Sequence, residues 1–527
     1  MSRVKTAALL SALIVVFVTL GWPFITRLGI EVDEALVGNG IYERAAPWYS
    51  WRLFGHEIPV MLLYYLGALK TWMYNAIFAI WPPGPVSLRL PTVLIAAASI
   101  LVQFVFVDRI LGRAAAWMSC ALIATDPSFV LSTAIDYGPV AVEHALKMGA
   151  LLALVKFHGD AGRRGYLALA FFVFGLAMWD KAVFSWILVA LAVAALAVLR
   201  RQVIAHVNLR NILTAAGAFA VGALPLIIYN IARPLETFRS TAKFSLEGAF
   251  IKLVLLKRTL DGSGMFGFLT APDSGPHPGV PHSVVQRFAF WLSSLFGSPS
   301  TTLTGIALIL VIATIPLVWR RPVRKPVLFF LIASVVIWLQ MFLTAGAGGA
   351  THHVILLWPF PAIIIAAVMS QLLSRRLLFG AAVVLCLSQL LVMNQHLVVL
   401  IRNGSSVRWT DAFAPLVTRL SNAHAKRVIT CDWGILETLN LMSEGELPVE
   451  DASAALRQLT TDNRQLTTRF DAPDALWVLH SSGREEWPGV NDALDRIAAS
   501  AGYSKEVLES IQDRNGRPIF DIVRFRR

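Results

Sequence analysis

Long apolar segments are the feature that most constrains this chain. A helix needs roughly 17–25 mainly apolar residues to cross a lipid bilayer. Eleven segments resemble such helices: 6–26, 91–107, 114–129, 140–157, 166–179, 183–199, 212–232, 303–319, 327–344, 354–373 and 377–396. Only 15% of the residues are charged, against roughly 25% in soluble domains. The sequence therefore predicts a multi-pass α-helical membrane protein with about eleven transmembrane helices.

Basic residues orient these segments. Residues 1–399 contain 30 Lys and Arg against 15 Asp and Glu, whereas 400–527 contain 16 against 18. An excess of Lys and Arg in short loops is typical of the cytoplasmic side. When the eleven segments alternate in direction, every short loop with an Arg pair falls on that side. No basic stripe lies on a soluble part, so we expect no nucleic-acid partner.

Two segments need separate interpretation. Segment 56–82 is apolar but interrupted by Lys70, by aromatic residues and by a Pro-Pro pair. Counting it as a span would reverse every later basic loop. We therefore interpret it as interfacial or re-entrant, one of the juxtamembrane helices of a first outer loop, 27–90. The first span has no small-residue cleavage site after it, which predicts a retained signal-anchor helix.

The remaining organisation follows from this topology. Residues 1–399 form the predicted membrane domain, with a long outer loop at 233–299. Its amphipathic part, 244–260, either lies against lipid headgroups or packs on the bundle. Residues 400–527 are predicted to form a small outer α/β domain. Its expected elements are strands at 426–433 and 475–480 and an amphipathic helix at 490–501.

Acidic residues gather at the predicted outer face. Glu31-Val32-Asp33-Glu34 follows the first span directly. Asp126 and Asp136 flank the outer end of the third span. Asp126 precedes a proline and is equally typical of a helix terminator, whereas Asp136 is the stronger functional candidate.

Basic and paired groups near this face allow alternative interpretations. Glu143 and Lys147, four residues apart in the fourth span, either neutralise each other or serve a function. Lys181 either pairs locally with Asp180 or holds a phosphate. The adjacent His352 and His353 indicate phosphate or headgroup contact more than metal binding. The three cysteines form neither a disulfide framework nor a CxxC metal site.

Several short motifs follow one another along the chain: Asp33-Glu34, His56-Glu57-Ile58-Pro59, Ser87-Leu88-Arg89-Leu90-Pro91, Asp136, Phe174-Gly175-Leu176-Ala177 through Lys181, and His352 through Pro361. In this order and topology they resemble the motifs of the polyprenyl-phosphate-sugar-dependent glycosyltransferases of the C superfold. The nearest branch is that of the protein O-mannosyltransferases and the lipid A aminoarabinose transferases. The resemblance covers roughly 4–376 and departs in the absence of a double proline at 56–59.

The resemblance implies an inverting transfer of a sugar from a polyprenyl-phosphate donor to an acceptor hydroxyl. A phosphate leaving group needs no general acid, but the hydroxyl needs a carboxylate base. Asp33 is the expected base, with Glu34 tuning it or anchoring the loop. Asp136 would orient the acceptor or, jointly with Asp33, hold a divalent metal ion.

The departing phosphate needs positive partners. Lys181 is the first candidate, followed by His352, His353 and Arg89. The sugar is not indicated by the sequence, and the acceptor is a lipid, a glycan or a protein. A bacterial inner membrane, with the site and the C-terminal domain on the periplasmic side, is the expected location.

Two other classes of protein compete with this interpretation. A secondary transporter or lipid flippase would explain the helix count and the charges in the fourth span. Transporters, however, tend to show paired broken helices and charges near the midplane, which this sequence does not indicate. A non-catalytic scaffold would leave the outer carboxylates without a use.

Overall fold

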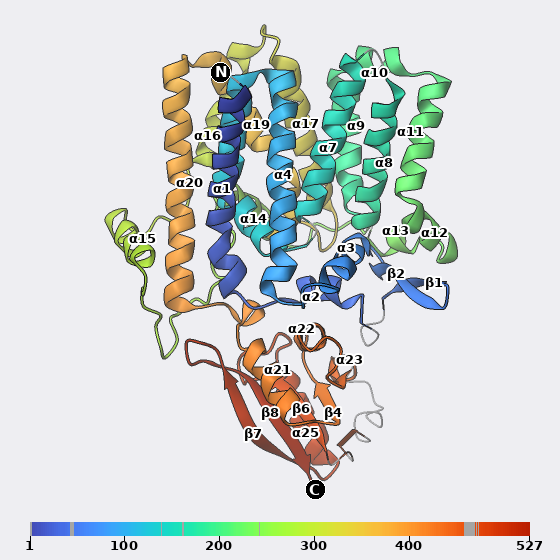
Figure 1. Cartoon of the computed structure of the whole chain (residues 1–527), viewed down its shortest axis with the longest axis vertical. Coiled ribbons are helices and arrows are strands. Elements are labelled where there is room, and N and C mark those ends of the chain that lie inside the picture. The colour runs from blue at the N-terminus through green and yellow to red at the C-terminus, as the bar shows by residue number, and fades with distance from the viewer. Residues whose placement is uncertain are drawn as a thin grey trace.

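The computed structural model describes residues 3–42, 47–138, 140–160, 163–241, 243–457, 469–470, 472 and 474–527. A bundle of long helices forms one end of the molecule, and a smaller α/β domain forms the other (Figure 1). The N-terminus lies at the end of the bundle farthest from this domain. Between the two lie short elements of the first loop, among them α2 and α3 (Figure 1).

Within the described residues, five helical segments are long and apolar enough to cross a membrane. They are α1 (Arg3–Arg27), α4 (Pro85–Leu111), α17 (Arg324–Leu343), the run Thr351–Leu372, which joins α18 (Thr351–Val354), η2 (Ile355–Leu357) and α19 (Phe360–Leu372), and α20 (Arg375–Asn403). Three bent pairs raise the number to eight: α5 (Arg113–Thr125) with α6 (Pro127–Ala134), α9 (Phe184–Val198) with α10 (Arg200–His206), and α11 (Leu209–Gly222) with α12 (Leu224–Ala232). The chain is an integral membrane protein.

All eleven predicted spans coincide with helical segments, although at most eight meet the length and composition of a crossing helix. The other three are α7 (Val140–Gly159), α8 (Arg164–Asp180) and α16 (Thr304–Ala313). α7 carries Glu143, Lys147 and Lys156. α8 has 17 residues and α16 only 10. The positions of the predicted helices are therefore confirmed, but fewer than eleven of them have the length and composition of a membrane-crossing helix.

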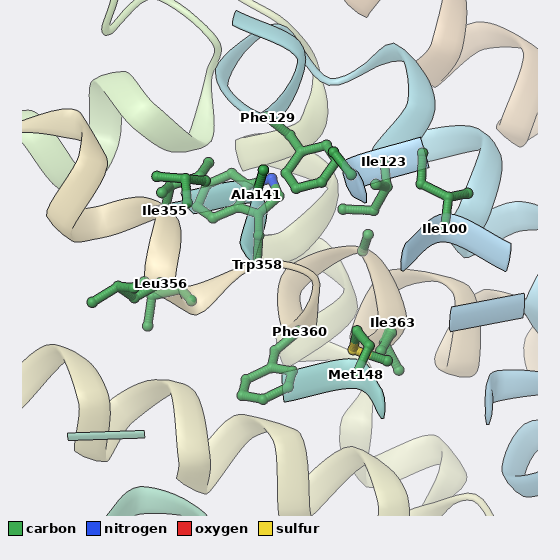
Figure 2. Close-up of a cluster of buried hydrophobic side chains, with 14 of the residues drawn as sticks. Ile100, Ile123, Phe129, Ala141, Met148, Ile355, Leu356, Trp358, Phe360 and Ile363 are labelled. Carbon is green, nitrogen blue, oxygen red and sulfur yellow. The ribbon is translucent and has the colours of Figure 1, made fainter. Parts of the chain in front are cut away.

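Close packing holds the bundle together. Figure 2 shows part of its core, where side chains from α4, α5, α6, α7 and α19 meet. Lipid is as apolar as these side chains, so van der Waals packing and close backbone approach supply much of the helix association. Glycines allow that approach between α8 and α11. A Cβ on Gly175 would lie 2.3 Å from the Phe219 carbonyl oxygen, and one on Gly222 2.1 Å from that of Phe172.

The first loop contains a small sheet that the sequence did not predict. Its strands are β1 (Tyr49–Leu53), β2 (His56–Leu63) and β3 (Leu66–Gly67), flanked by α2 (Val32–Asn39) and α3 (Leu69–Phe78). Segment 56–82 does not span the bundle, as predicted, but its first part is a strand and not a helix. The reason is a tight turn: Phe54 and Gly55 both have positive φ and join β1 to β2 as an antiparallel hairpin.

The C-terminal domain is a mixed sheet with helices. The sheet order is β5-β4-β6-β8-β7, with β5, β4 and β6 parallel and the β7–β8 hairpin antiparallel to β6. Its strands are β4 (Arg427–Thr430), β5 (Val449–Asp451), β6 (Ala475–His480), β7 (Ser504–Gln512) and β8 (Pro518–Arg526). Its helices are α21 (Phe413–Asn422), α22 (Ile435–Met442), α23 (Ser453–Arg457) and α25 (Val490–Ser500), and η3 (Val407–Trp409) precedes them.

The two predicted strands and the predicted amphipathic helix of this domain are present as β4, β6 and α25. The hairpin was not predicted. β7 is largely exposed along its length, so it lacks the run of apolar residues that reveals a buried strand.

The long loop after α12 carries α13 (Glu236–Thr241), α14 (Ala249–Leu260) and α15 (Val284–Leu295). α14 packs on the bundle, which is the second of the two expectations for this segment. Its buried Lys252 donates hydrogen bonds to the carbonyl oxygens of Met341, Phe342 and Thr344, at 3.3, 2.9 and 2.8 Å. These bonds satisfy the end of α17.

Candidate active site

The acidic segment after α1 folds into α2. Glu31 is its N-cap: the side-chain Oε2 accepts a hydrogen bond from the backbone N–H of Asp33 at 2.7 Å. Glu34 completes a capping box by accepting from the Glu31 N–H at 3.2 Å. Glu31 and Glu34 therefore satisfy the first turn of α2, and Asp33 is left to project from it.

Glu34 also forms a buried ion pair with Arg89 of α4. Arg89 Nε and Nη2 each donate to one Glu34 carboxylate oxygen, both at 2.7 Å. The two side chains are 1% and 0% exposed, so neither reaches solvent. This geometry is the bidentate arrangement that gives the strongest arginine–carboxylate contacts.

The other N–H groups of Arg89 cap the end of α1. Nη1 donates to the carbonyl oxygens of Ile25 and Leu28, at 3.0 and 2.8 Å, and Nη2 to that of Gly29 at 2.6 Å. With its donors used within the protein, Arg89 has no capacity for a donor phosphate. The structure thus corrects its place among the phosphate ligands and, of the two roles expected for Glu34, favours loop anchoring.

Asp33 is half-buried and has a different environment. Burial raises the pKa of its carboxyl above the ordinary value, while the positive charges of Lys181, Lys70 and Arg408 oppose that rise. A carboxylate with a raised pKa accepts a proton more readily than a solvated one, and cationic neighbours favour its ionised form, so Asp33 is a suitable general base.

Asp136 lies in the loop after α6, with a φ of 45°. Its Oδ2 accepts a hydrogen bond from Lys70 Nζ at 2.7 Å and one from the Tyr74 hydroxyl at 3.2 Å, both from α3. Its Oδ1 is buried and has no partner among the described residues. Burial raises the pKa of Asp136, and Lys70 lowers it. One oxygen is therefore fixed and the other is free.

Lys181 follows α8 directly. Its backbone forms a bridge with Leu66, and the next residue, Ala182, donates to the Tyr65 carbonyl at 2.9 Å. The side chain is buried, but its ammonium makes no hydrogen bond or ion pair with the described residues. Burial lowers the pKa of Lys181, and Glu143 and Asp33 raise it. A buried cation without a direct partner is costly and is typical of a ligand site.

Gly138 brings Lys181 and His352 together. A Cβ at this glycine, whose φ is 69°, would lie 3.4 Å from Lys181 Nζ and 3.7 Å from His352 Cδ2. His352 packs against the Tyr137 ring at 4.2 Å between centroids, and against His353 at the same distance. The Nδ1 atoms of both histidines are buried without partners among the described residues.

Other charged groups near the site have mixed roles. Lys147 donates to the carbonyl oxygens of Leu356 and Trp358 and makes no ion pair with Glu143 among the described residues. Glu143 Oε1 and Asp180 Oδ2 are buried without hydrogen-bond partners there. Asp126 caps α6 by accepting from the Phe129 N–H at 2.9 Å. The helix-terminus interpretation of Asp126 is therefore confirmed, whereas Lys147 makes its direct hydrogen bonds to backbone carbonyls and not to Glu143.

The metal candidates do not form a recognisable ligand group. No set of three or more His, Cys, Asp or Glu side chains is arranged to hold a metal ion within the described ranges. One Asp136 oxygen is engaged by Lys70 and Tyr74, so this carboxylate has a single oxygen left for a ligand. We derive no step through a metal ion.

The C-terminal domain contacts the helix that carries Asp33. Asn39 of α2 donates to the Glu437 carbonyl at 2.6 Å and accepts from Asn440 Nδ2 of α22 at 3.0 Å. Leu441 of α22 belongs to the apolar cluster of the first loop, with Ile30, Ala35 and Val37. α2 is thus held by α4 from one side and by α22 from another, which fixes the position of Asp33.

Lys70 is the residue of this site that sequence reasoning missed. In the sequence, Lys70 interrupts an apolar segment. A lysine in an apolar segment needs a partner, so its position alone indicates a buried ion pair. That partner, Asp136, lies 66 positions away, so only the tertiary structure identifies it.

The fold of this chain is similar to those of several solved proteins, although its sequence is not. No protein-family model and no curated protein sequence matches the chain. Among solved structures, it is similar to ArnT from Cupriavidus metallidurans in the apo state, at a TM-score of 0.61 and 14% identity, covering 99% of this chain and 98% of that one. ArnT bound to undecaprenyl phosphate gives a TM-score of 0.60 at the same identity and coverage.

A second similar structure is the Archaeoglobus fulgidus oligosaccharyltransferase in its apo form. The TM-score is 0.50 at 12% identity, covering 96% of this chain and 70% of that one. The likeness extends over both the bundle and the C-terminal domain in ArnT. The chain therefore shares the overall fold of ArnT and of this oligosaccharyltransferase.

Proposed function

We propose that this protein is an inverting glycosyltransferase that moves a sugar from a polyprenyl-phosphate donor to an acceptor hydroxyl. The observation that carries the proposal is the presence of two unequal groups at the same end of the bundle. Asp33 is a half-buried carboxylate that projects from a rigid helix, and Lys181 is a buried ammonium without a direct partner. The fold, shared with ArnT, which has been solved with undecaprenyl phosphate, supports a lipid-phosphate ligand.

The reaction assigns one task to each group. Asp33 accepts the proton of the acceptor hydroxyl as its oxygen attacks the anomeric carbon. The bond from that carbon to the phosphate oxygen breaks, and the electron pair leaves with the polyprenyl phosphate. A single displacement of this kind inverts the configuration at the anomeric carbon.

Lys181 would stabilise the charge that gathers on the leaving phosphate. In the resting protein its ammonium is balanced at a distance by the carboxylates of Glu143, Asp33 and Asp180. Gly138 leaves room beside the ammonium. His352 and His353 would each contribute to phosphate binding from the same side, through a nitrogen of their own ring. Asp136, held by Lys70, would orient the acceptor or the sugar through its free oxygen.

The proposal extends to the side of the membrane. The site faces the C-terminal domain (Figure 1), and the basic loops follow the opposite ends of the helices. By the excess of Lys and Arg in cytoplasmic loops, the site and the domain at 400–527 lie on the outer face. A bacterial inner membrane, with a periplasmic site, is the location that we propose.

The test is transfer from a radiolabelled polyprenyl-phosphate sugar in membranes that contain the protein or its Asp33→Asn variant. The expected result is release of label by the unchanged protein and loss of at least about 100-fold in the variant, the usual contribution of a general base. Asp33→Asn should retain donor binding, because the lysine is untouched. Equal turnover by both proteins would remove Asp33 from this role. If neither protein consumed any donor in a panel of sugars while lipid or solute crossed the membrane, the protein would be a transporter.

A further inference from the structure

The helix α15 has its apolar side turned away from the protein. It lies outside the bundle, alongside α20 (Figure 1). Its small residues face that helix: Asn394 of α20 donates to the Ala289 carbonyl at 2.8 Å, and Ser293 donates to Gln395. Ala289 and Ser293 are the buried positions of α15.

The opposite face of α15 carries large apolar side chains. Val284, Phe288, Trp291 and Leu295 are 72%, 57%, 54% and 59% exposed. Their spacing of four, three and four residues places them on one stripe of the helix, and Ala289 and Ser293 on the other side. Phe296 extends the stripe beyond the end of the helix and is 53% exposed. A water-facing helix normally has the reverse pattern, so this stripe indicates an apolar neighbour.

The contact with α20 fixes the depth of α15 in the membrane. α20 begins at Arg375, on the basic side of the bundle, and Asn394 follows 19 positions later. At 1.5 Å per residue this is about 29 Å, close to the roughly 30 Å of the hydrocarbon core. The exposed apolar side chains of α20 all lie before this point, at Leu377, Phe379, Val383, Val384 and Leu387. α15 therefore sits where the core meets the headgroups.

We propose that α15 is an in-plane membrane helix, with its apolar stripe inserted in the leaflet on the side of the candidate site. The partner is the phospholipid surface itself. An amphipathic helix at this depth buries its apolar face among the upper acyl chains, and a tryptophan is favoured at that interface. The inference depends on the membrane fold and not on the proposed transfer reaction.

The segment that leads to α15 also contacts the end of α20 and the C-terminal domain. Gly279 donates to the Arg402 carbonyl at the end of α20, and His277 to the Asn515 carbonyl of the C-terminal domain, both at 2.9 Å. Asn515 donates back to the His277 carbonyl at 3.0 Å. One short connection is therefore attached to the membrane through α15 and to the C-terminal domain through Asn515. It holds that domain at a fixed height above the bilayer.

The test uses spin labels on the full-length protein in nanodiscs of phosphatidylcholine and phosphatidylglycerol. The half-buried Cys386 is replaced by alanine, and Cys120 and Cys431 are buried. Single cysteines are then introduced by Phe288→Cys or Trp291→Cys on the stripe. Two controls are Ser294→Cys, exposed on the same helix but off the stripe, and Ser482→Cys, exposed in the C-terminal domain.

Accessibility of each label to oxygen, which dissolves in lipid, is compared with accessibility to a water-soluble nickel chelate. We expect the ratio of oxygen accessibility to chelate accessibility at positions 288 and 291 to exceed the ratio at 482 by at least about fivefold, and the ratio at 294 to lie between them. Ratios at 288 and 291 equal to that at 482 would mean that the stripe faces water, and the proposal would be wrong. Protection from both reagents would mean that protein covers the stripe, as in a second copy of the chain, and would overturn it equally.

Discussion

Two buried charge clusters each include a residue of the first loop, Glu34 in one and Lys70 in the other, and they differ in completeness. In the first, Glu34 and Arg89 use their polar atoms within the protein, on each other and on the end of α1. In the second, Lys70 and Asp136 are paired, but Asp136 Oδ1 has no partner among the described residues and neither does the Lys181 ammonium. Both clusters are removed from solvent.

The difference separates a structural charge pair from a site. Removing charge from water is costly, and only complete pairing offsets the cost. The first cluster meets that condition and fixes α2 to α4. The second does not, so part of its cost is not offset in the free protein. Natural proteins keep such incomplete groups mainly where a ligand completes them.

The largest effect is expected from breaking the complete cluster. Arg89→Met leaves the buried Glu34 carboxylate unpaired and uncaps α1, which should cost about 3–5 kcal/mol of stability. Thermal unfolding in detergent measures it. The double variant Glu34→Gln with Arg89→Met removes the orphan charge and should recover part of the loss. An unchanged melting temperature in Arg89→Met would mean that the pair has no structural role.

Breaking the incomplete cluster should have the opposite signature. Lys181→Met removes a buried cation that has no direct partner, so stability should stay equal or rise. Affinity for a polyprenyl phosphate should fall by roughly 10–100-fold, because a hydrogen bond to a charged group contributes about 1.5–3 kcal/mol. Lys325→Met, at the basic end of the bundle, is the control and should leave affinity unchanged. A destabilised Lys181→Met with normal affinity would assign Lys181 to structure.

The pH dependence of transfer sharpens the link between Lys181 and Asp33. Burial raises the pKa of Asp33, and Lys181 is the first of the cations that lower it. A base must be deprotonated, so kcat/KM should fall as the pH drops through that raised pKa. In Lys181→Met the opposing cation is gone, so the acid limb should move to higher pH. A limb that stays in place would show that the two groups do not interact.

The smallest effect is expected at Gly138. Gly138→Ala places a methyl group 3.4 Å from Lys181 Nζ at a φ of 69°, and it should weaken donor binding by a few-fold through crowding. Left-handed backbone at a non-glycine residue costs about 1–2 kcal/mol in itself. Gly489→Ala is the matched control, since its backbone is left-handed, with φ of 83° and ψ of 7°, and nothing lies within 4 Å of the added carbon. Equal losses of donor binding in both variants would mean that backbone strain alone causes the loss.

Much of the fold is encoded locally and could be predicted. Apolar length and the placement of basic loops located the membrane helices, because bilayer thickness and loop charge act on each segment separately. β4, β6 and α25 were predicted from short apolar patterns. The β1–β2 hairpin and the exposed β7 were missed, because each depends on a turn or a partner strand more than on its own periodicity.

The site divides in the same way. Carboxylates, a lysine and two histidines could be assigned to one end of the bundle from the sequence alone, because alternating spans place them there. The sequence could not decide which of them are free. Arg89 and Asp33 look equally available in the sequence, yet one is enclosed by Glu34 and the end of α1, and the other projects from a capped helix. This distinction depends on the tertiary structure, because the partners that make a charged group paired or available are distant in the chain.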